Sequence, residues 1–314
     1  MNETEIKKQI CDHLTEYRIN KLHIADLGEF TDANRNTTLH GWILPQSEKN
    51  YEKNLILDIY SNEVKEEYLK LLPENSDDKK NHRHTYFHHL NSSQAMALNF
   101  FIPLTLNKDV FSKVLFNENA GYNLSTVFEL INKSYFEFLE SDEVLGIKNF
   151  PFHKTNFDFV QECTDRKLYF EVKYTEPAFE GKNKKTIDDH DKNLPDQDKN
   201  NYKFKWDAWY KKQLEDIGIF LSGYSDFYSN YQIWRNISYS KYGDVIFTFP
   251  SFRKKLQTQL DACLKLMTDA KYKDKIHILY SDRVCEYLMK ESTDTKLKQH
   301  YTLFWEKYFE GIGK

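Results

Sequence analysis

The residues of this chain that could do chemistry together lie in one segment, TNFDFVQECTDRKLYFEVKYTE, residues 155–176. Asp158 is in one apolar run, and Glu171 and Lys173 are in the next run, separated by a single valine. Side chains two residues apart in a strand point to the same face, so Glu171 and Lys173 would share a face. A carboxylate beside a lysine, with a second carboxylate on a neighbouring strand, is the set that a magnesium-dependent phosphodiester-cleaving site needs.

The two apolar runs predict a β-hairpin. The second run, KLYFEVKY, is rich in aromatic and β-branched residues, which favour strands. The polar stretch TDRK between the runs is typical of a turn, so residues 156–163 and 167–175 are expected to pair as strands. The same residues also fit a second interpretation, an exposed ion pair across the strands of an ordinary hairpin.

The Glu-x-Lys pattern is not specific by itself, because it also occurs at residues 5–7, 63–65 and 180–182. The second of these even repeats Glu-Val-Lys, with Asp58 upstream. The apolar residues that follow it recur at helical spacing, and a helix does not hold side chains two apart next to each other. The strand-like surroundings of residues 171–173 separate them from these repeats.

Together, Asp158, Glu171 and Lys173 resemble the signature of the PD-(D/E)XK nuclease superfamily, which has the restriction-endonuclease-like fold. That signature is an acid, a variable gap, and then Asp or Glu, any residue and Lys, carried on adjacent strands. Phe157 precedes Asp158 here, so the proline of the signature's name is absent. Two further segments, SSQAMALNFFIPL and YQIWRN, are similar to a little-characterised bacterial branch of the same superfamily, and the resemblance covers residues 85–250.

The resemblance implies a mixed α/β fold with a central sheet flanked by helices. The nuclease core is expected over residues 121–314, with an N-terminal accessory region, residues 1–120, packed on it. Residues 181–200 have almost no apolar side chains, so we expect them to form a mobile loop or a polar insertion.

Periodicity predicts the elements that must position the candidate residues. In the core we expect a helix at residues 124–133, a first strand at 134–140, the hairpin, and then helix, strand, helix, strand and helix. In the N-terminal region we expect a helix at the start of the chain and short strands at GWIL and NLILDIY. A further helix should begin at SSQA, capped by serine, and close at Pro103.

For the site, the resemblance implies one or two Mg²⁺ ions, for which Mn²⁺ could substitute. Asp158 and Glu171 would be the metal ligands, and the main-chain carbonyl of Val172 could add another. Lys173 would orient the attacking water or stabilise the developing negative charge, and its part in proton transfer stays open. The helix after the hairpin would supply a polar residue, for which Gln232 is the natural candidate.

Basic residues near the hairpin are candidates for contacts with phosphate. Gln232, Arg235 and Asn236 share one helical face, and a solvated face is the alternative interpretation for all three. The solvated face is the preferred interpretation for Arg235, although Arg235 stays a candidate for contact with nucleic acid. A second candidate group is formed by the lysines that follow the hairpin, Lys182, Lys184 and Lys185.

Two other groups of residues were weighed against simpler interpretations. Glu137 could supply a third acid from the strand before the hairpin, but an exposed glutamate on an edge strand is preferred. The histidine-rich stretch HRHTYFHH, residues 82–89, is interpreted first as a surface loop. Contact with DNA phosphate is the second interpretation and a zinc site the third.

The composition narrows the class of protein. With 314 residues, 23 Phe and 21 Tyr, the chain can bury a substantial core. The net charge of −4 excludes a histone-like polyanion binder but not a nuclease with a local basic cleft. The four cysteines have no metal-ligand spacing, and no apolar stretch reaches the length of a membrane span. Reduced thiols and a soluble, cytoplasmic protein that makes no membrane contact are therefore expected.

The sequence thus predicts a metal-dependent nuclease with DNA as the favoured substrate, in restriction or host defence by family analogy. The alternative is a catalytically silent module of the same fold that binds nucleic acid or protein. A homodimer is an option that the resemblance leaves open, since many restriction-like enzymes dimerise to cut both strands.

Overall fold

The computed structural model describes residues 2–32, 34–70, 86–116, 129–141, 144–145, 155–198 and 200–313. In chain order, its elements are α1 (Glu3–Asn20), β1 (Gly28–Thr31), β2 (Thr37–His40), α2 (Glu48–Lys53), α3 (Asn62–Lys70), α4 (Ser93–Thr105), α5 (Lys108–Leu115), β3 (Leu130–Leu139), β4 (Asn156–Cys163), β5 (Lys167–Val172), α6 (Lys184–Asp191), α7 (Tyr202–Lys205), the π-helix η2 (Trp206–Tyr210), α8 (Lys211–Glu215), α9 (Tyr224–Ser229), α10 (Tyr231–Ile237), the 3₁₀ helix η3 (Ser238–Lys241), β6 (Gly243–Phe249), α11 (Lys254–Leu264), α12 (Ala270–Lys273), β7 (Ile276–Tyr280), α13 (Ser281–Glu291) and α14 (Thr295–Tyr308).

The centre of the fold is a mixed sheet of five strands in the order β3-β4-β5-β6-β7. Neighbours are antiparallel from β3 to β5 and parallel from β5 to β7. The parallel pairs need crossover connections, and the helices between β5, β6 and β7 supply them. The predicted fold class, a mixed α/β sheet flanked by helices, is confirmed.

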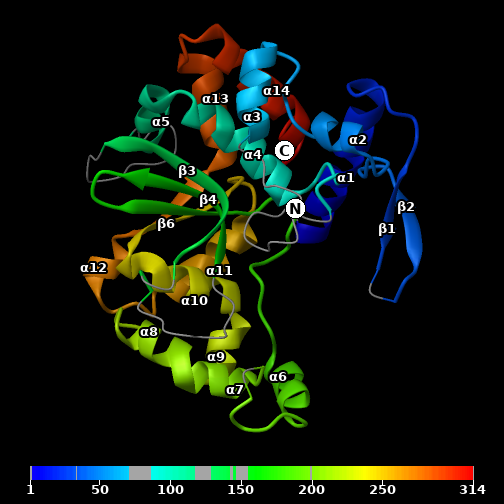
Figure 1. Ribbon diagram of the computed structural model, residues 1–314. Helices are drawn as coiled ribbons and strands as arrows, with labels where there is room; N and C mark the ends of the chain where they lie inside the picture. The colour runs from blue at the N-terminus through cyan, green and yellow to red at the C-terminus, as the bar shows by residue number, and fades with distance from the viewer. Residues whose placement is uncertain are drawn as a thin grey trace.

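Helices cover both faces of this sheet (Figure 1). On one face, α4, α5, α13 and α14 form a core in which Phe101 stacks on Phe159 of β4, with ring centroids 4.3 Å apart. On the other face, α8 to α11 form a second core that includes Phe247 of β6 and Trp234 of α10. A sheet buried on both faces explains why β6, GDVIFTF, is buried along its whole length.

The N-terminal region takes part in the first core. Ile10 and Leu14 of α1 and Phe100 of α4 belong to the same buried cluster as Phe170 of β5. In contrast, β1 and β2 form a separate two-stranded hairpin that projects from the body (Figure 1). The boundary at residue 120 stays a prediction.

Several predicted elements need correction. The helix expected at residues 124–133 is wrong in its last part, since β3 begins at Leu130; residues 121–128 lie outside the described residues. GWIL contributes a single bridge, Ile43 with His89, and NLILDIY forms no strand. The strands of this region are β1 and β2, and Pro103 lies inside α4 instead of closing it.

Several helices were not predicted, and α6 and α13 lie in the expected core. The stretch expected as a mobile loop at residues 181–200 contains α6, capped by the side chain of Asn183 and anchored by the buried Ile187. One apolar anchor and a good cap are enough to fix a short helix in an otherwise polar segment. In addition, α13 lies between β7 and α14.

Within the described residues, no helix combines the length and the apolar character that crossing a membrane would require.

Candidate active site

The predicted hairpin is confirmed and brings the acid pair together. In the antiparallel register of β4 and β5, Phe159 pairs with Phe170. Asp158 Oδ2 accepts a hydrogen bond of 2.6 Å from the main-chain N–H of Val172, the residue after Glu171. One carboxylate is thereby tied to the backbone beside the other.

Glu171 and Lys173 lie beside each other, as the strand spacing predicted. The ammonium of Lys173 is 3.0 Å from Glu171 Oε1. The intervening Val172 points into the core on the opposite face of the sheet. β5 ends at Val172, but the N–H of Lys173 still donates to the carbonyl of Thr248 in β6 (2.9 Å), which continues the strand pairing by one residue.

Acids surround Lys173 and keep it charged. Burial disfavours the ammonium, but the carboxylates of Glu171, Glu176 and Asp158 outweigh that effect and raise the pKa of Lys173. Glu176 accepts the N–H of Tyr174 at 2.9 Å. Burial opposes the ionisation of Glu176, but the charge of Lys173 and the hydrogen bond from Tyr174 lower the pKa of Glu176. An ammonium held in this way can orient water or stabilise an anion, but it is a poor proton acceptor.

Two amides of α10 hold the carboxylate of Glu171. Gln232 Nε2 donates to Oε1 (2.5 Å), and Asn236 Nδ2 donates to Oε2 (2.9 Å). Gln232 is thus in the place that the sequence suggested. Asn236 was predicted to share this helical face but not to contact the site, although its spacing of four residues from Gln232 indicates such a contact.

Glu137 is a third acid of the cluster, in contrast to the exposed side chain that was preferred. It lies on the edge strand β3 with φ of 51°, a left-handed conformation that is strained for a residue with a side chain. Its carboxylate accepts hydrogen bonds from Gln94 of α4 (2.7 Å) and Asn156 of β4 (2.5 Å).

Burial and mutual repulsion oppose ionisation of two of these acids. Burial raises the pKa of Glu137 to about 7, although its two amide partners act in the opposite direction. Burial also raises the pKa of Asp158 well above its usual range, and the charges of Glu171 and Glu137 raise it further. A second positive charge near these acids, in addition to Lys173, would stabilise their ionised forms.

The donor set fits a single Mg²⁺ ion. Within the described ranges, no group of three or more His, Cys, Asp or Glu side chains is placed to hold a metal. Mg²⁺ usually takes only one or two carboxylates and keeps several waters. Asp158 and Glu171 supply that number; Glu171 is buried and Asp158 is half-buried, and a cation would offset the repulsion between the two carboxylates.

The acids open into a pocket of about 320 Å³. Asp158 and Glu137 line it together with the first turn of α4 and with Tyr86, His89 and Asn91. Within HRHTYFHH, His82 and His84 lie outside the described residues, while His88 is buried and His89 lines the pocket. The interpretation as a surface loop is therefore wrong for His88.

The basic residues predicted to contact phosphate are not among the described residues that line this pocket. The guanidinium of Arg235 donates to Thr155 Oγ1 (3.3 Å) and lies over the ring of Tyr231. Lys182 is 3.8 Å from a carboxylate oxygen of Glu180. In the first turn of α6, Lys184 and Lys185 are exposed. Their contacts with nucleic acid stay predictions.

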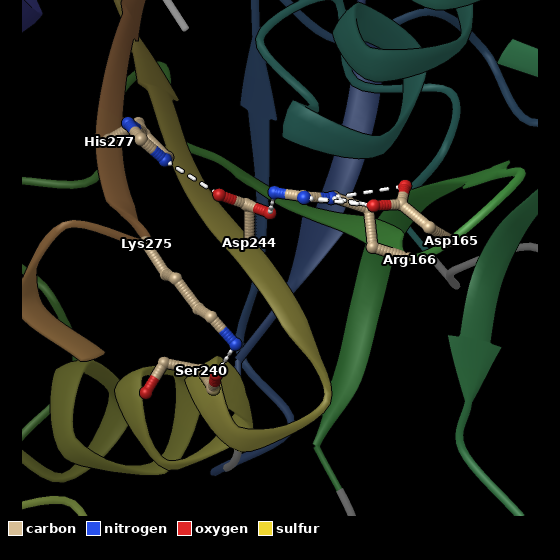
Figure 2. A network of polar contacts seen from close by, with 6 residues as sticks. All are labelled: Asp165, Arg166, Ser240, Asp244, Lys275 and His277. Atoms are coloured by element: carbon tan, nitrogen blue, oxygen red, sulfur yellow. Dashed lines mark hydrogen bonds and ion pairs between the residues drawn. The ribbon is translucent and has the colours of Figure 1, made fainter. Parts of the chain in front are cut away.

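A second polar network lies at the amino-terminal ends of β5, β6 and β7, the ends opposite to the one that carries Glu171 (Figure 2). Asp244 lies at the start of β6. Its Oδ1 is 3.0 Å from His277 Nε2, and its Oδ2 is 3.3 Å from the guanidinium of Arg166, which also pairs with Asp165. These polar groups bond to one another and join the turn before β5 to β6 and β7. Ligands of open α/β sheets bind at the carboxyl ends of parallel strands, where Glu171 lies, so this network is structural.

No curated protein matches the chain, and no solved structure matches it either. One family model does match, over residues 25–309, and its description is Restriction Endonuclease associating with ARP. The matched range includes the central sheet and each of the candidate residues Glu137, Asp158, Glu171, Lys173, Gln232 and Asn236. Since it spans nearly the whole sequence, the chain belongs to this restriction-endonuclease-like family, REase-ARP.

Proposed function

We propose that the protein is a metal-dependent nuclease of the PD-(D/E)XK type, which hydrolyses phosphodiester bonds, with DNA as the favoured substrate. The observation that carries the proposal is the geometry of the hairpin. Asp158 is bonded to the backbone beside Glu171, and Lys173 is 3.0 Å from Glu171. Membership of a restriction-endonuclease family favours DNA and a role in restriction or defence.

Asp158 and Glu171 would hold Mg²⁺ or Mn²⁺, and the main-chain carbonyl of Val172 is a further candidate ligand. The bound ion would lower the pKa of water and neutralise charge on the phosphate. Gln232 and Asn236 hold the Glu171 carboxylate in one orientation, which fixes the direction in which its remaining lone pairs point.

Lys173 contributes as a cation in this proposal. Its raised pKa keeps it protonated at neutral pH, so it does not accept the proton of the attacking water. Its ammonium can orient that water through a hydrogen bond and can stabilise the negative charge that develops on the phosphate.

A cleavage assay tests the proposal directly. Purified protein with Mg²⁺ or Mn²⁺ should nick or cut plasmid DNA, linear duplex or single strands, and EDTA should stop the reaction. Lys173→Ala should lower the cleavage rate by at least about 10²-fold, the loss typical of a donor that stabilises developing charge. Circular dichroism and thermal melting should show that the variant is folded.

The chain supplies a matched control. The tripeptide Glu63-Val64-Lys65 repeats the same letters, but it lies in α3, and Lys65 pairs only loosely with Asp58, at 4.0 Å. Lys65→Ala should cleave at the parent rate. Equal activity of Lys173→Ala and the parent would refute the role assigned to Lys173, and metal-independent cleavage would refute the role of the acids.

A further inference from the structure

An irregular segment after β5 joins the active site to α6 (Figure 1). We call residues 176–182 of this segment the connector. It starts at Glu176, which lines the pocket beside the acids. Phe179 is 3% exposed, and its ring packs edge-on against Phe247 of β6, with centroids 5.2 Å apart. The connector is therefore anchored on the same sheet that carries the acids.

Two glutamines bind consecutive residues of the connector. Gln259 of α11 accepts the N–H of Phe179 (2.9 Å) and donates to the carbonyl of Phe179 (3.4 Å). The same amide donates to Asn230 Oδ1, directly before α10 (3.0 Å). Glu180 donates its N–H to Gln232 Oε1, and the main-chain N–H of Gln232 donates to the carbonyl of Glu180, both at 3.1 Å. These bonds hold the connector in a fixed position on α10 and α11.

Gly181 lets the connector approach α9 more closely than any side chain would allow. A Cβ at this position would lie 2.1 Å from the carbonyl oxygen of Ser229, the last residue of α9. The neighbouring atom belongs to the backbone, so it cannot rotate away as a side chain could. At the same place, Lys182 donates its N–H to the carbonyl of Tyr228 (2.6 Å). A side chain at residue 181 would push the connector, with Glu180, away from its partners.

The N–H of Glu180 decides which end of the Gln232 amide faces Glu171. A primary amide has an acceptor at one end and donors at the other, and half a turn exchanges the two ends. A main-chain N–H can only donate, and an ionised carboxylate can only accept. Because Gln232 Oε1 is bonded to Glu180, Nε2 is directed to the carboxylate of Glu171, at 2.5 Å. Without the bond to Glu180, the amide could turn its oxygen to that carboxylate.

We propose that Gln259 and Gly181 are positioning residues of the active site. They fix the connector, the connector orients the amide of Gln232, and this amide holds Glu171 in the direction that a metal ligand needs. The two residues act through Gln232 and not by contact with metal or substrate. The proposal rests on the proposed nuclease function and adds the outer contacts that keep one of its metal ligands in place.

The orientation of the Gln232 amide can be measured without metal or substrate. In ¹⁵N-labelled protein in EDTA, the NMR signal of this side-chain amide is identified by its loss in Gln232→Ala. A proton that is donated to a carboxylate resonates downfield of a solvated amide proton. Gly181→Ala displaces the connector, and Gln259→Leu removes the bonds to Phe179 without adding bulk near the backbone. Both variants should move the Gln232 signal towards that of a solvated amide.

The chain supplies a matched control for each variant. Gly223→Ala makes the same change where a Cβ would meet no atom of the described residues within 4 Å. Gln257→Leu alters the other half-buried glutamine of α11, whose side chain forms no hydrogen bond within the described part of the chain. Both controls should leave the Gln232 signal in place. Thermal melting in EDTA should show that all four variants are folded.

Mn²⁺ affinity is the second readout, followed through the electron paramagnetic resonance signal of the free ion. Gly181→Ala and Gln259→Leu should each raise the Kd for Mn²⁺ by about 10-fold, the lower end for residues that orient a metal ligand. In the Gln232→Ala background, the same changes should alter the Kd by less than about twofold, because the amide through which they act is gone. A general loss of packing would instead add to the effect of Gln232→Ala.

The outcomes separate this inference from the nuclease proposal. An unmoved Gln232 signal in folded Gly181→Ala and Gln259→Leu would overturn the inference, whatever the protein cleaves. Additive losses of Mn²⁺ affinity with Gln232→Ala would overturn it as well. If the signal moves as expected but the wild-type protein binds no Mn²⁺ and cuts nothing, the connector still orients Gln232, and it is the nuclease proposal that fails.

Discussion

Glu137 is the residue in which the strain of the site is most visible. Its backbone is left-handed, its side chain is half-buried and accepts hydrogen bonds from two amides, and its pKa is raised to about 7. A sequence does not keep such an arrangement for stability, because an ordinary strand with an exposed glutamate would be less strained. The left-handed backbone places a third carboxyl group beside Asp158, and a bound cation would stabilise the ionised form of both groups.

This residue makes a prediction about pH and stability. Because the folded-state pKa of Glu137 lies above its ordinary value of 4.5, the metal-free native state holds a proton that the unfolded chain has released. Its contribution to the free energy of unfolding is therefore largest below pH 4.5 and is lost as the pH rises towards about 7. Glu137→Gln should remove that loss, which amounts to roughly 3 kcal/mol at most.

The measurement is urea unfolding in EDTA at pH 5.5 and pH 8. The parent should lose more stability between these two values than Glu137→Gln does. Glu16→Gln, at an exposed position on α1, removes the same charge away from the site and is the control. Parallel pH profiles for the parent and Glu137→Gln would contradict the raised pKa that burial gives this acid.

At the scale of elements, α10 acts on the site through two amides one turn apart. Gln232 and Asn236 bond to different oxygens of the same carboxylate, so each limits the rotation that the other leaves free. Once either amide is removed, the carboxylate of Glu171 can rotate, and the hydrogen bond to the second amide is weakened. The two residues should behave as one unit.

A double-mutant cycle tests this coupling. Gln232→Ala and Asn236→Ala should each lower kcat/KM by about 10- to 100-fold, as is typical for residues that orient a metal ligand. The double variant should lose less than the product of the two single effects. Arg235→Ala, on the same helix but bonded to Thr155, should leave the coupling unchanged. Multiplicative losses would mean that the amides act independently.

The elements that the sequence predicted well are those with a local signal. The hairpin follows from two apolar runs with a polar turn, and the shared face of Gln232 and Asn236 follows from helical spacing. Residues 130–133 were assigned to a helix because apolar side chains recur there at three and four residues. In the structure Leu130 pairs with Cys163 of β4, and the register shifts before Ser134. Pairing with a distant strand overrode the local pattern.

The parts of the site that were missed depend on such distant contacts. Glu137 has a left-handed backbone in β3, which no neighbouring glycine signals in the sequence. Gln94 meets it from α4, 43 positions away in the sequence. The ring of Tyr86, which lines the pocket, packs against Phe30, more than fifty residues earlier in the chain. None of these contacts has a periodicity that one sequence could show.

For the whole molecule, the site lies where the two helical layers meet the carboxyl ends of the strands. α4 belongs to one layer and donates to Glu137 through Gln94, while α10 belongs to the other and donates to Glu171. The acids are therefore assembled only when both cores are packed. A cation that binds them binds the native state and not the unfolded chain, so it should stabilise the whole fold.

The size of that effect can be predicted. A metal ion at one hundred times its Kd adds about 2.7 kcal/mol, which for a chain of this size raises Tm by about 5 °C. Mn²⁺ should give this rise at pH 8 and a smaller rise at pH 6. At the lower pH, Glu137, with a pKa of about 7, and Asp158, with a raised pKa, tend to be protonated, so the ion must compete with protons. Asp158→Asn should melt at a higher temperature than the parent in EDTA, since a buried charge is gone, and should gain little from Mn²⁺. If the parent and Asp158→Asn gained equally, the stabilising ion would be bound elsewhere, and the hairpin acids would not be its ligands.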